Sequence, residues 1–263
     1  MKKYGLIGYP LSHSFSKKYF TDKFQREGIA GAQYDLYPIE DIKTFNEFLH
    51  QNPDLCGLNV TIPYKVDVLD FVDFVGEEAH RVGAINTIRI TRQSPVAAAF
   101  SGEVGEVGDD FRLDGYNTDV YGFEMSLRPL LKSHHESALV LGNGGAAKAV
   151  FYVLDKLEIP YATITRRKMD GTILFDELDP EMVAENKLII NTTPVGTSPN
   201  VDECPPIPYD QITPEHLLYD LIYNPEQTLF LKKGAEQGAA TKNGHEMLIL
   251  QAERAWEIWN QND

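Results

Sequence analysis

A glycine-rich turn at residues 142–147, GNGGAA, has the strongest chemical signature in the sequence. It follows the apolar run ALVL and precedes an alanine-rich segment with helical spacing, so backbone N–H groups and a helix dipole would converge on a pyrophosphate-sized anion. Ala147 replaces the third glycine of the usual fingerprint, where only a small residue is needed. The turn predicts a dinucleotide site; the alternative is a strand-to-helix turn without a ligand.

A basic cluster follows the next strand-like run, at Thr165, Arg166, Arg167 and Lys168. An acidic residue at this place would select NAD through the ribose 2′-hydroxyl. Guanidinium groups instead match phosphate oxygens, so the cluster favours the 2′-phosphate of NADP. The alternative is a solvated basic turn.

Lys65 ends the run NVTIPYK, in which Pro63 stops further strand pairing. Thr61 and Lys65 are therefore expected at the carboxyl end of a strand, where open α/β sheets bind ligands. A lysine there can give a proton to a carbonyl oxygen or take one from a hydroxyl. An exposed lysine without a catalytic role is the competing interpretation.

Polar side chains beside glycines or prolines form further candidates. Asn86 and the Asn117-Thr118-Asp119 segment each follow a glycine, so they could point at a ligand, or cap turns. Asp119 could orient and charge-stabilise Lys65. Ser14 and Ser16 lie two residues apart before a helix, which suits either a bound carboxylate or an N-cap.

The composition narrows the class of protein. The chain has 263 residues, is 43% hydrophobic and carries a formal charge of −15, which argues against a nucleic-acid binder with a broad basic face. No apolar run is long enough for a membrane span, so a cytoplasmic protein is expected. The two cysteines and the histidines have no metal or triad spacing, so no metal site is predicted.

The elements that must position these residues alternate between strand and helix. Strand-length apolar runs and helical segments alternate over residues 4–62, which predicts a largely parallel α/β sheet, and the alternation restarts near residue 137. The segment 91–114 has no sustained period and predicts an extended hairpin or a mobile loop. Residues 245–260 have apolar spacing typical of a helix that needs an apolar partner.

Taken in order, eight motifs resemble the shikimate dehydrogenase family: GYPLSHSFS, NVTIPYK, GAINT, GYNTD, GNGGAA, NTTPVG, DLIYNP and the terminal G-x-x-M-L-x-x-Q from Gly244. The chain departs from the family's usual pattern at Lys17, in Thr165-Arg166-Arg167, at Thr197 and in the longer segment 91–114. The resemblance implies a two-domain α/β fold. A substrate-binding catalytic domain would comprise residues 1–119 with 244–263, and a Rossmann-like NADP-binding domain residues 120–243.

The resemblance also implies an activity and a set of site residues. The activity is the NADP-dependent interconversion of 3-dehydroshikimate and shikimate in chorismate and aromatic amino acid biosynthesis, by a monomer or homodimer. The alternatives are a quinate/shikimate dehydrogenase that uses NAD and a non-catalytic NADP-binding sensor. Lys65 and Asp119 would be the catalytic pair. The substrate would contact Ser14, Ser16, Asn59, Thr61, Asn86, Tyr223 and Gln251, and the cofactor Gly142, Asn143, Gly144, Gly145, Ala146, Thr165, Arg166, Arg167, Thr192 and Gly244.

Overall fold

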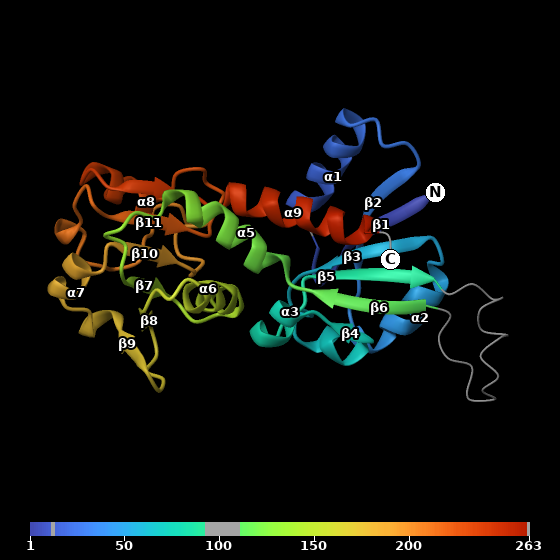
Figure 1. Ribbon diagram of the computed structural model, residues 1–263, viewed down its shortest axis with the longest axis horizontal. Coiled ribbons are helices and arrows are strands. Elements are labelled where there is room, and N and C mark those ends of the chain that lie inside the picture. Colours follow the sequence, from blue (N-terminus) through green and yellow to red (C-terminus); the bar gives the residue numbers. More distant parts are fainter. Residues whose placement is uncertain (12–13, 93–110, 262–263) are drawn as a thin grey trace. The chain divides into compact units, whose positions relative to one another are not determined.

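The computed structural model describes residues 1–11, 14–92 and 111–261, and the chain forms two compact units. Unit 1 comprises Met1–Thr118 together with Gln251–Asp263, and unit 2 comprises Asp119–Leu250. The chain passes from one unit to the other twice, within helix α5 (Thr118–Leu127) and within helix α9 (His245–Asn260) (Figure 1). None of the described helices is long and apolar enough to cross a membrane.

Unit 1 contains a six-stranded mixed sheet with the order β2-β1-β3-β5-β6-β4. Strands β2, β1 and β3 are parallel, as predicted, but β5 runs antiparallel to both of its neighbours. The apolar runs that predicted the sheet do not fix strand direction, because parallel and antiparallel ladders both satisfy the backbone N–H and C=O groups. The segment 91–114, for which a hairpin or a mobile loop is predicted, begins in β5 and ends in β6, and these two strands pair with each other. Its residues 93–110 lie outside the part of the chain that the structure describes. The strands are β1 (Lys2–Gly8), β2 (Ala32–Pro38), β3 (Leu55–Val60), β4 (Phe74–Val75), β5 (Thr87–Arg92) and β6 (Phe111–Tyr116).

Helices cover both faces of the unit 1 sheet. Because parallel crossovers are right-handed, stepping outward from β1 to β2 and then back to β3 places α1 (Phe15–Arg26) and α2 (Phe45–Gln51) on opposite faces. Two apolar clusters follow from this arrangement. Phe20 and Phe24 of α1 pack with the described part of α9, whereas Phe45 and Leu49 of α2 pack on the other face. Unit 1 also contains α3 (Glu77–Val82) and the short 3₁₀ helices Ile42–Thr44 and Asp67–Phe71.

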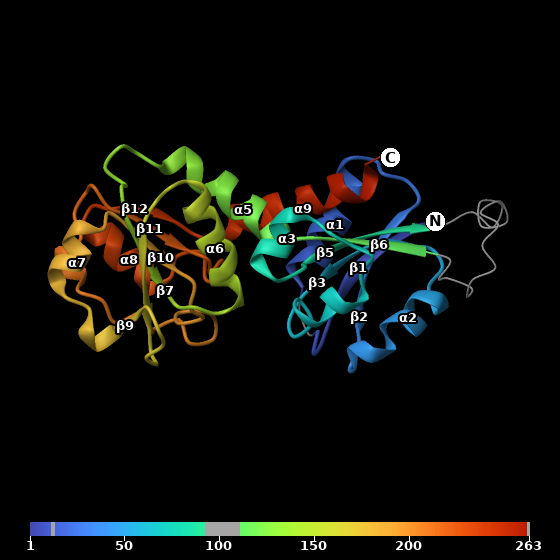
Figure 2. The ribbon, with the colours of Figure 1, turned by 60° about the horizontal axis from the view of Figure 1, so that its bottom comes forward.

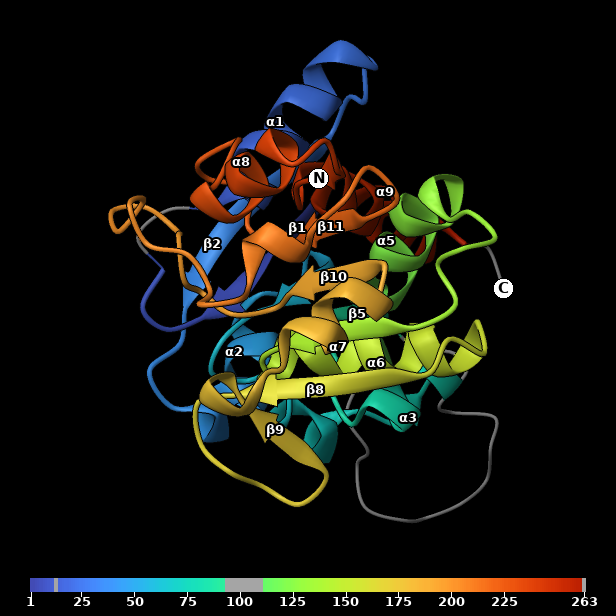
Figure 3. The same cartoon turned by 90° about the vertical axis from the view of Figure 1, so that its left-hand side faces the viewer.

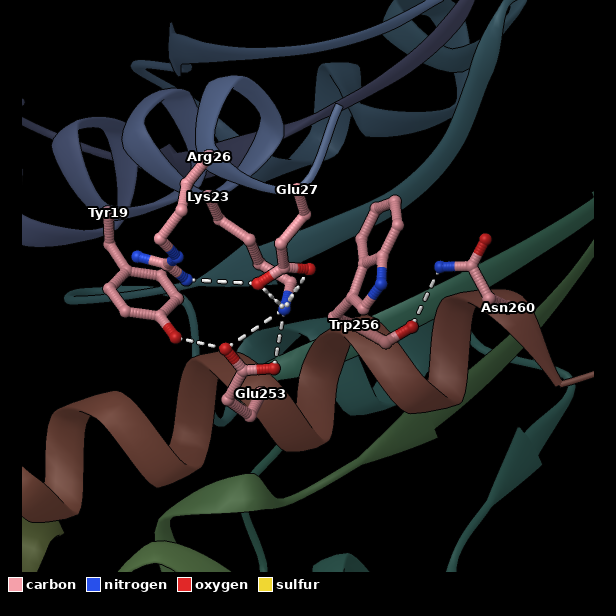
Figure 4. A network of polar contacts seen from close by, with 7 residues as sticks. All are labelled: Tyr19, Lys23, Arg26, Glu27, Glu253, Trp256 and Asn260. Carbon is pink, nitrogen blue, oxygen red and sulfur yellow. Dashed lines mark hydrogen bonds and ion pairs between the residues drawn. The ribbon is translucent and has the colours of Figure 1, made fainter. Parts of the chain in front are cut away.

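A polar network joins α1 to α9 within this otherwise aromatic interface, as Figure 4 shows. The buried Lys23 ammonium lies 2.7 Å from Glu253 Oε2 and 3.0 Å from Glu27 Oε2. The Tyr19 hydroxyl donates to Glu253 as well. Nearby, the Trp259 indole N–H donates to the Ile88 carbonyl oxygen at 3.0 Å, so the terminal helix has the apolar partner that its spacing predicts.

Unit 2 contains a six-stranded parallel sheet with the order β12-β11-β10-β7-β8-β9. Its central strands are wholly buried, which is typical of parallel sheets covered on both faces. Helices α6 (Gly145–Lys156) and α8 (Leu229–Glu236) lie on either side of the sheet (Figure 2). The remaining elements are α7 (Pro180–Glu185), β7 (Ala138–Leu141), β8 (Tyr161–Thr165), β9 (Thr172–Leu174), β10 (Leu188–Asn191), β11 (Leu217–Asp220), β12 (Ala240–Lys242) and the 3₁₀ helices Arg128–Leu130, Phe175–Glu177 and Tyr209–Gln211.

Candidate functional site

One edge of the unit 1 sheet carries three of the seven predicted substrate residues, Asn59, Thr61 and Asn86. The antiparallel register pairs Asn59 of β3 with Thr87 of β5, and Thr87 with Tyr116 of β6. The carboxyl ends of β3 and β6 therefore meet the amino end of β5 at this edge. The loops at this edge carry the predicted residues Thr61, Lys65 and Asn86, and α5 begins beside them at Thr118.

Hydrogen bonds fix the orientation of the two asparagine amides at this edge. Tyr34 donates its hydroxyl to Asn59 Oδ1 at 2.8 Å, and Asn59 Nδ2 lies 3.2 Å from Thr87 Oγ1. Asn86 Oδ1 accepts the backbone N–H of Thr118 at 2.7 Å. Sequence reasoning missed Tyr34, since a tyrosine within a strand has no local pattern that marks it as a polar partner.

The two predicted serines have different surroundings. The Ser14 side chain accepts the backbone N–H of Lys17 at 3.2 Å, so this hydroxyl is the N-cap of α1. The Ser16 side chain lies near the Tyr34 phenol. Burial raises the pKa of this phenol, and the nearby Ser16 opposes the shift. Ser16 and Asn59 are thus both neighbours of one buried phenol.

The turn that carries Lys65 is fixed by the backbone and by a buried tyrosine. Thr61 donates its N–H to the Ile7 carbonyl oxygen at 3.0 Å, and Ile85 donates its N–H to the Lys65 carbonyl oxygen at 2.7 Å. The buried Tyr64 hydroxyl donates to the Ile39 carbonyl oxygen at 2.6 Å. These bonds hold the backbone from which the partly buried Lys65 side chain extends.

The other predicted substrate and catalytic residues are distributed over three elements. Asp119 is the second residue of α5 and is 9% exposed. It directly follows Thr118, whose N–H is bound by Asn86. Gln251 lies partly buried on α9, and Tyr223 follows β11 in unit 2 with 41% of its surface exposed.

In unit 2, a cavity of about 410 Å³ opens at the carboxyl ends of β7, β8 and β10. It brings together the glycine turn, the basic cluster and the loop after β10. The predicted cofactor residues on its wall are Gly142, Asn143, Gly144, Thr165, Arg166, Arg167 and Thr192. The wall also contains residues that sequence reasoning missed, namely Met169, Phe175, Thr193, Pro194 and Val195. Gly145, Ala146 and Gly244 are not among its lining residues.

The glycines of the turn serve different purposes. Gly142 has φ +104°, and a Cβ there would lie 2.7 Å from Thr192 Oγ1, so the fold itself requires a glycine. Gly144 and Gly145 have no atom of the described residues within 4 Å of an added Cβ. The space above these two residues at the start of α6 fits the close approach of a pyrophosphate to backbone N–H groups.

The charges on the cavity wall favour a phosphate. The residues that line it include two arginines and no Asp or Glu. Arg166 and Arg167 are exposed and form no ion pair with a carboxylate of the described residues. Lys168 is instead paired with Glu177, at 2.5 Å, and this bond lowers the pKa of the Glu177 carboxyl. An adjoining cavity of about 300 Å³ shares Arg166 and Phe175 with the first.

A buried carboxylate organises the loop after β10. Asp220 accepts hydrogen bonds from Asn191 Nδ2 at 3.0 Å and from the Thr228 hydroxyl at 2.6 Å. Asn191 Oδ1 in turn accepts the Thr193 hydroxyl at 2.7 Å. Burial raises the Asp220 pKa from 3.8 to about 6, against the opposing effect of these bonds. Asp220 therefore supports the cavity wall without lining it.

Gly244 belongs to a different contact in unit 2. Its N–H donates to the Ile222 carbonyl oxygen at 3.0 Å. A Cβ at this position would lie 2.1 Å from the Leu221 carbonyl oxygen, so the close backbone contact requires glycine. Gly244 therefore fixes the start of α9 against the loop after β11. Among the described residues, no group of three or more His, Cys, Asp or Glu side chains could hold a metal ion.

Comparisons with known proteins agree on one family. Residues 6–88 match the family model described as "Shikimate dehydrogenase substrate binding domain". A Clostridium beijerinckii protein named "Shikimate dehydrogenase (NADP(+))" is 38% identical over 272 residues, covering 99% of this chain and 93% of the relative. The crystal structure of shikimate dehydrogenase from Aquifex aeolicus is 30% identical with a TM-score of 0.80, covering 99% and 92% of the two chains. That of Thermus thermophilus shikimate 5-dehydrogenase, in complex with NADP(H) and shikimate, is 27% identical with a TM-score of 0.79, covering 99% and 94%.

Proposed function

Because the chain belongs to the shikimate dehydrogenase family, we propose that it catalyses the reversible NADPH-dependent reduction of 3-dehydroshikimate to shikimate, in chorismate and aromatic amino acid biosynthesis. The observation that carries the proposal is the 38% identity to an NADP-dependent relative over 99% of this chain. The arrangement of polar side chains in unit 1 and of the cavity in unit 2 supports it.

Lys65 is proposed as the group that moves the proton. It gives a proton to the substrate carbonyl oxygen as that oxygen gains negative charge, and takes it back from the hydroxyl in the reverse direction. NADPH, when bound, supplies the hydride. Asp119 is proposed as the second member of the catalytic pair, which orients the lysine.

The substrate is proposed to bind along the edge of the unit 1 sheet. The Ser14 and Ser16 hydroxyls would hold the carboxylate, and the side chains of Asn59, Thr61, Asn86, Tyr223 and Gln251 would hold hydroxyls or the ring. The N-cap bond of Ser14 is compatible with this role, because the Ser14 hydroxyl accepts the Lys17 N–H and keeps its own hydrogen to donate. Tyr34 would orient Ser16 and Asn59 from behind.

The cofactor is proposed to occupy the cavity of unit 2. The pyrophosphate would lie over Gly144 and Gly145 at the start of α6, where the space is open. The 2′-phosphate would contact Arg166 and Arg167, which have no carboxylate partner among the described residues. Gly142, Asn143, Ala146, Thr165, Thr192 and Gly244 complete the proposed cofactor set.

One assay of the purified protein tests reaction, substrate and cofactor together. Oxidation rates are measured with shikimate and with quinate, each with NADP⁺ and with NAD⁺. We expect the highest kcat/KM for shikimate with NADP⁺. A higher value for quinate with NAD⁺ would establish the quinate/shikimate alternative, and no turnover with any pair would favour the non-catalytic sensor.

Replacing Arg166 separates the two cofactors. Only the 2′-phosphate distinguishes NADP from NAD, so Arg166→Ala is expected to raise KM for NADP⁺ and leave KM for NAD⁺ nearly unchanged. Lys168→Ala is the matched control, because Lys168 is paired with Glu177. Equal kcat/KM for the two cofactors in the unmodified protein would contradict the assignment. The cytoplasmic location of the protein and its state as a monomer or homodimer stay predictions. Size-exclusion chromatography of the purified protein would measure the oligomeric state.

A further inference from the structure

The connection between β8 and β9 is unusually short for parallel neighbours. The two strands pair in parallel, with Thr163 opposite Thr172, and β9 lies at the edge of the sheet (Figure 3). Parallel strands are normally joined through a crossover of a dozen or more residues, usually with a helix. Here the chain returns through the six residues from Arg166 to Gly171. The two arginines of the proposed phosphate site lie on this short crossover.

Without a helix, the crossover depends on other hydrogen bonds for its shape. The Thr172 N–H donates to the Met169 carbonyl oxygen at 3.1 Å, which closes a turn, and Gly171 has φ +73° within it. The Thr172 hydroxyl bonds the same residue twice. It accepts the Met169 N–H at 3.0 Å and donates to the Met169 carbonyl oxygen at 2.9 Å.

A second threonine completes the support from the other side of the crossover. The Thr165 hydroxyl, on a residue that is 4% exposed, donates to the Arg167 carbonyl oxygen at 2.9 Å. The same hydroxyl lies 3.1 Å from the Thr172 hydroxyl. The two side chains thus hold the backbone on both sides of Lys168, while the cavity wall contains Arg166, Arg167 and Met169 but not Thr172.

We propose that Thr172 is a positioning residue that sets the preference for NADP over NAD. Its hydroxyl holds the turn that presents Arg166 and Arg167 to the 2′-phosphate, and it does so without lining the cavity. The inference rests on the proposed function for the identity of the cofactor. Thr172 belongs neither to the glycine turn nor to the basic cluster, so the proposal adds a new residue to those that determine cofactor specificity.

The test replaces Thr172 by valine, which keeps the branched shape and removes the hydroxyl. Binding of 2′,5′-ADP and of 5′-AMP is measured by isothermal titration calorimetry, because the two probes differ at the 2′-phosphate. Thr172→Val is expected to weaken 2′,5′-ADP by roughly 3- to 10-fold, the scale of one or two lost hydrogen bonds, with no change for 5′-AMP. KM for NADP⁺ should rise by the same factor, while kcat and KM for NAD⁺ stay constant.

Two variants serve as controls. Thr172→Ser keeps the hydroxyl and should restore 2′,5′-ADP binding to near the unmodified value. Thr163→Val, on the neighbouring strand and without a bond to the crossover, should leave both probes unaffected. An equal loss of both probes in Thr172→Val, or no loss, would overturn the inference. A protein that binds 2′,5′-ADP in a Thr172-dependent way but does not oxidise shikimate would uphold it and refute the proposed function.

Discussion

At the scale of single residues, the proposed chemistry depends on backbone bonds that hold side chains in place. The turn of Lys65 is fixed through its own carbonyl oxygen, which accepts the Ile85 N–H at 2.7 Å. Asn86 accepts the N–H of Thr118, directly before Asp119, at 2.7 Å. Removing either reacting side chain should therefore change the chemistry while the backbone around it is retained.

Lys65→Ala is expected to lower kcat by about 100-fold or more, the scale of a lost general acid or base. NADP binding should stay near normal, because the cofactor cavity lies within unit 2. Steady-state kinetics with shikimate, together with titration of NADP⁺, give both quantities. Lys43→Ala, at an exposed lysine of unit 1, is the control and should have no effect. Near-normal kcat in Lys65→Ala would refute the assignment of Lys65 as the proton-transfer group.

Asp119→Asn is expected to lower kcat and to raise the KM for shikimate, and the same steady-state kinetics measure both quantities.

The glycine turn offers a pair of variants with opposite expectations. Gly144→Ala should fold normally, since φ −74° and ψ −172° suit alanine and no described atom lies within 4 Å of the added Cβ. It should nevertheless weaken NADP by about 10-fold or more, because the methyl group occupies the space for the pyrophosphate. Gly142→Ala should instead destabilise the fold by about 1–3 kcal/mol, since φ there is +104°.

Thermal unfolding followed by circular dichroism measures the folding of both glycine variants, and calorimetric titration measures NADP binding. Unchanged NADP affinity in a well-folded Gly144→Ala protein would place the pyrophosphate elsewhere.

Local patterns in the sequence predict one part of this site, and contacts between distant residues form the rest. The glycine turn and the basic cluster could be predicted because strand, turn and helix signals stand next to each other. Tyr34 and Asp220 could not, because their partners Asn59 and Asn191 lie 25 and 29 residues away along the chain. The pairing of Thr165 with Thr172 depends on the register of β9, a strand too short for its alternation to be recognised.

At the scale of elements, the long apolar runs form the predicted strands, and the direction of β5 is the exception to the predicted parallel sheet. The apolar runs that became β7, β10 and β11 are buried on both faces, so they have the continuous hydrophobicity of parallel strands. The direction of β5 relative to β3 could not be predicted, because run length and apolar spacing contain no information about which way a strand runs.

The junction of α1 and α9 gives an element-scale prediction. Lys23→Met removes the ammonium between Glu27 and Glu253, which should lower the free energy of unfolding by about 1–3 kcal/mol. This range lies below that of a fully buried pair, because the two carboxylate side chains are 38% and 34% exposed. Urea unfolding followed by circular dichroism measures the change.

Two further proteins make that measurement specific. Lys23→Met combined with Glu253→Gln should recover part of the loss, because one uncompensated carboxylate is then neutral. Lys18→Met, at an exposed position of the same helix, should change little. A Lys23→Met protein as stable as the unmodified one would show that the network contributes nothing to the junction.

At the scale of the whole molecule, stability depends on pH through the buried Asp220. Its pKa is raised from 3.8 to about 6 by burial, and the groups that oppose the shift, Thr228, Ile222 and Asn191, are uncharged. The folded state therefore binds the proton more tightly than the unfolded state. This group should lower the free energy of unfolding as pH rises from about 4 to about 6, in total by on the order of 3 kcal/mol.

Asp220→Asn removes this titration. As pH rises from 4 to 7, the free energy of unfolding of the unmodified protein should therefore fall relative to that of the variant. Urea unfolding at several pH values between 4 and 7 provides the comparison. A difference that does not vary with pH would contradict the raised pKa.

The two passages of the chain between units determine which unit can be completed first during synthesis. Unit 2 is one continuous stretch, Asp119–Leu250, so all of its strands have been synthesised before the last turns of α9 are made. Unit 1 waits for those turns, in which Ala255 and Trp259 cover the aromatic face formed by Tyr4, Phe20 and Phe24. Unit 1 is therefore finished after unit 2, and a nascent chain exposes this face until the last turns of α9 have been made.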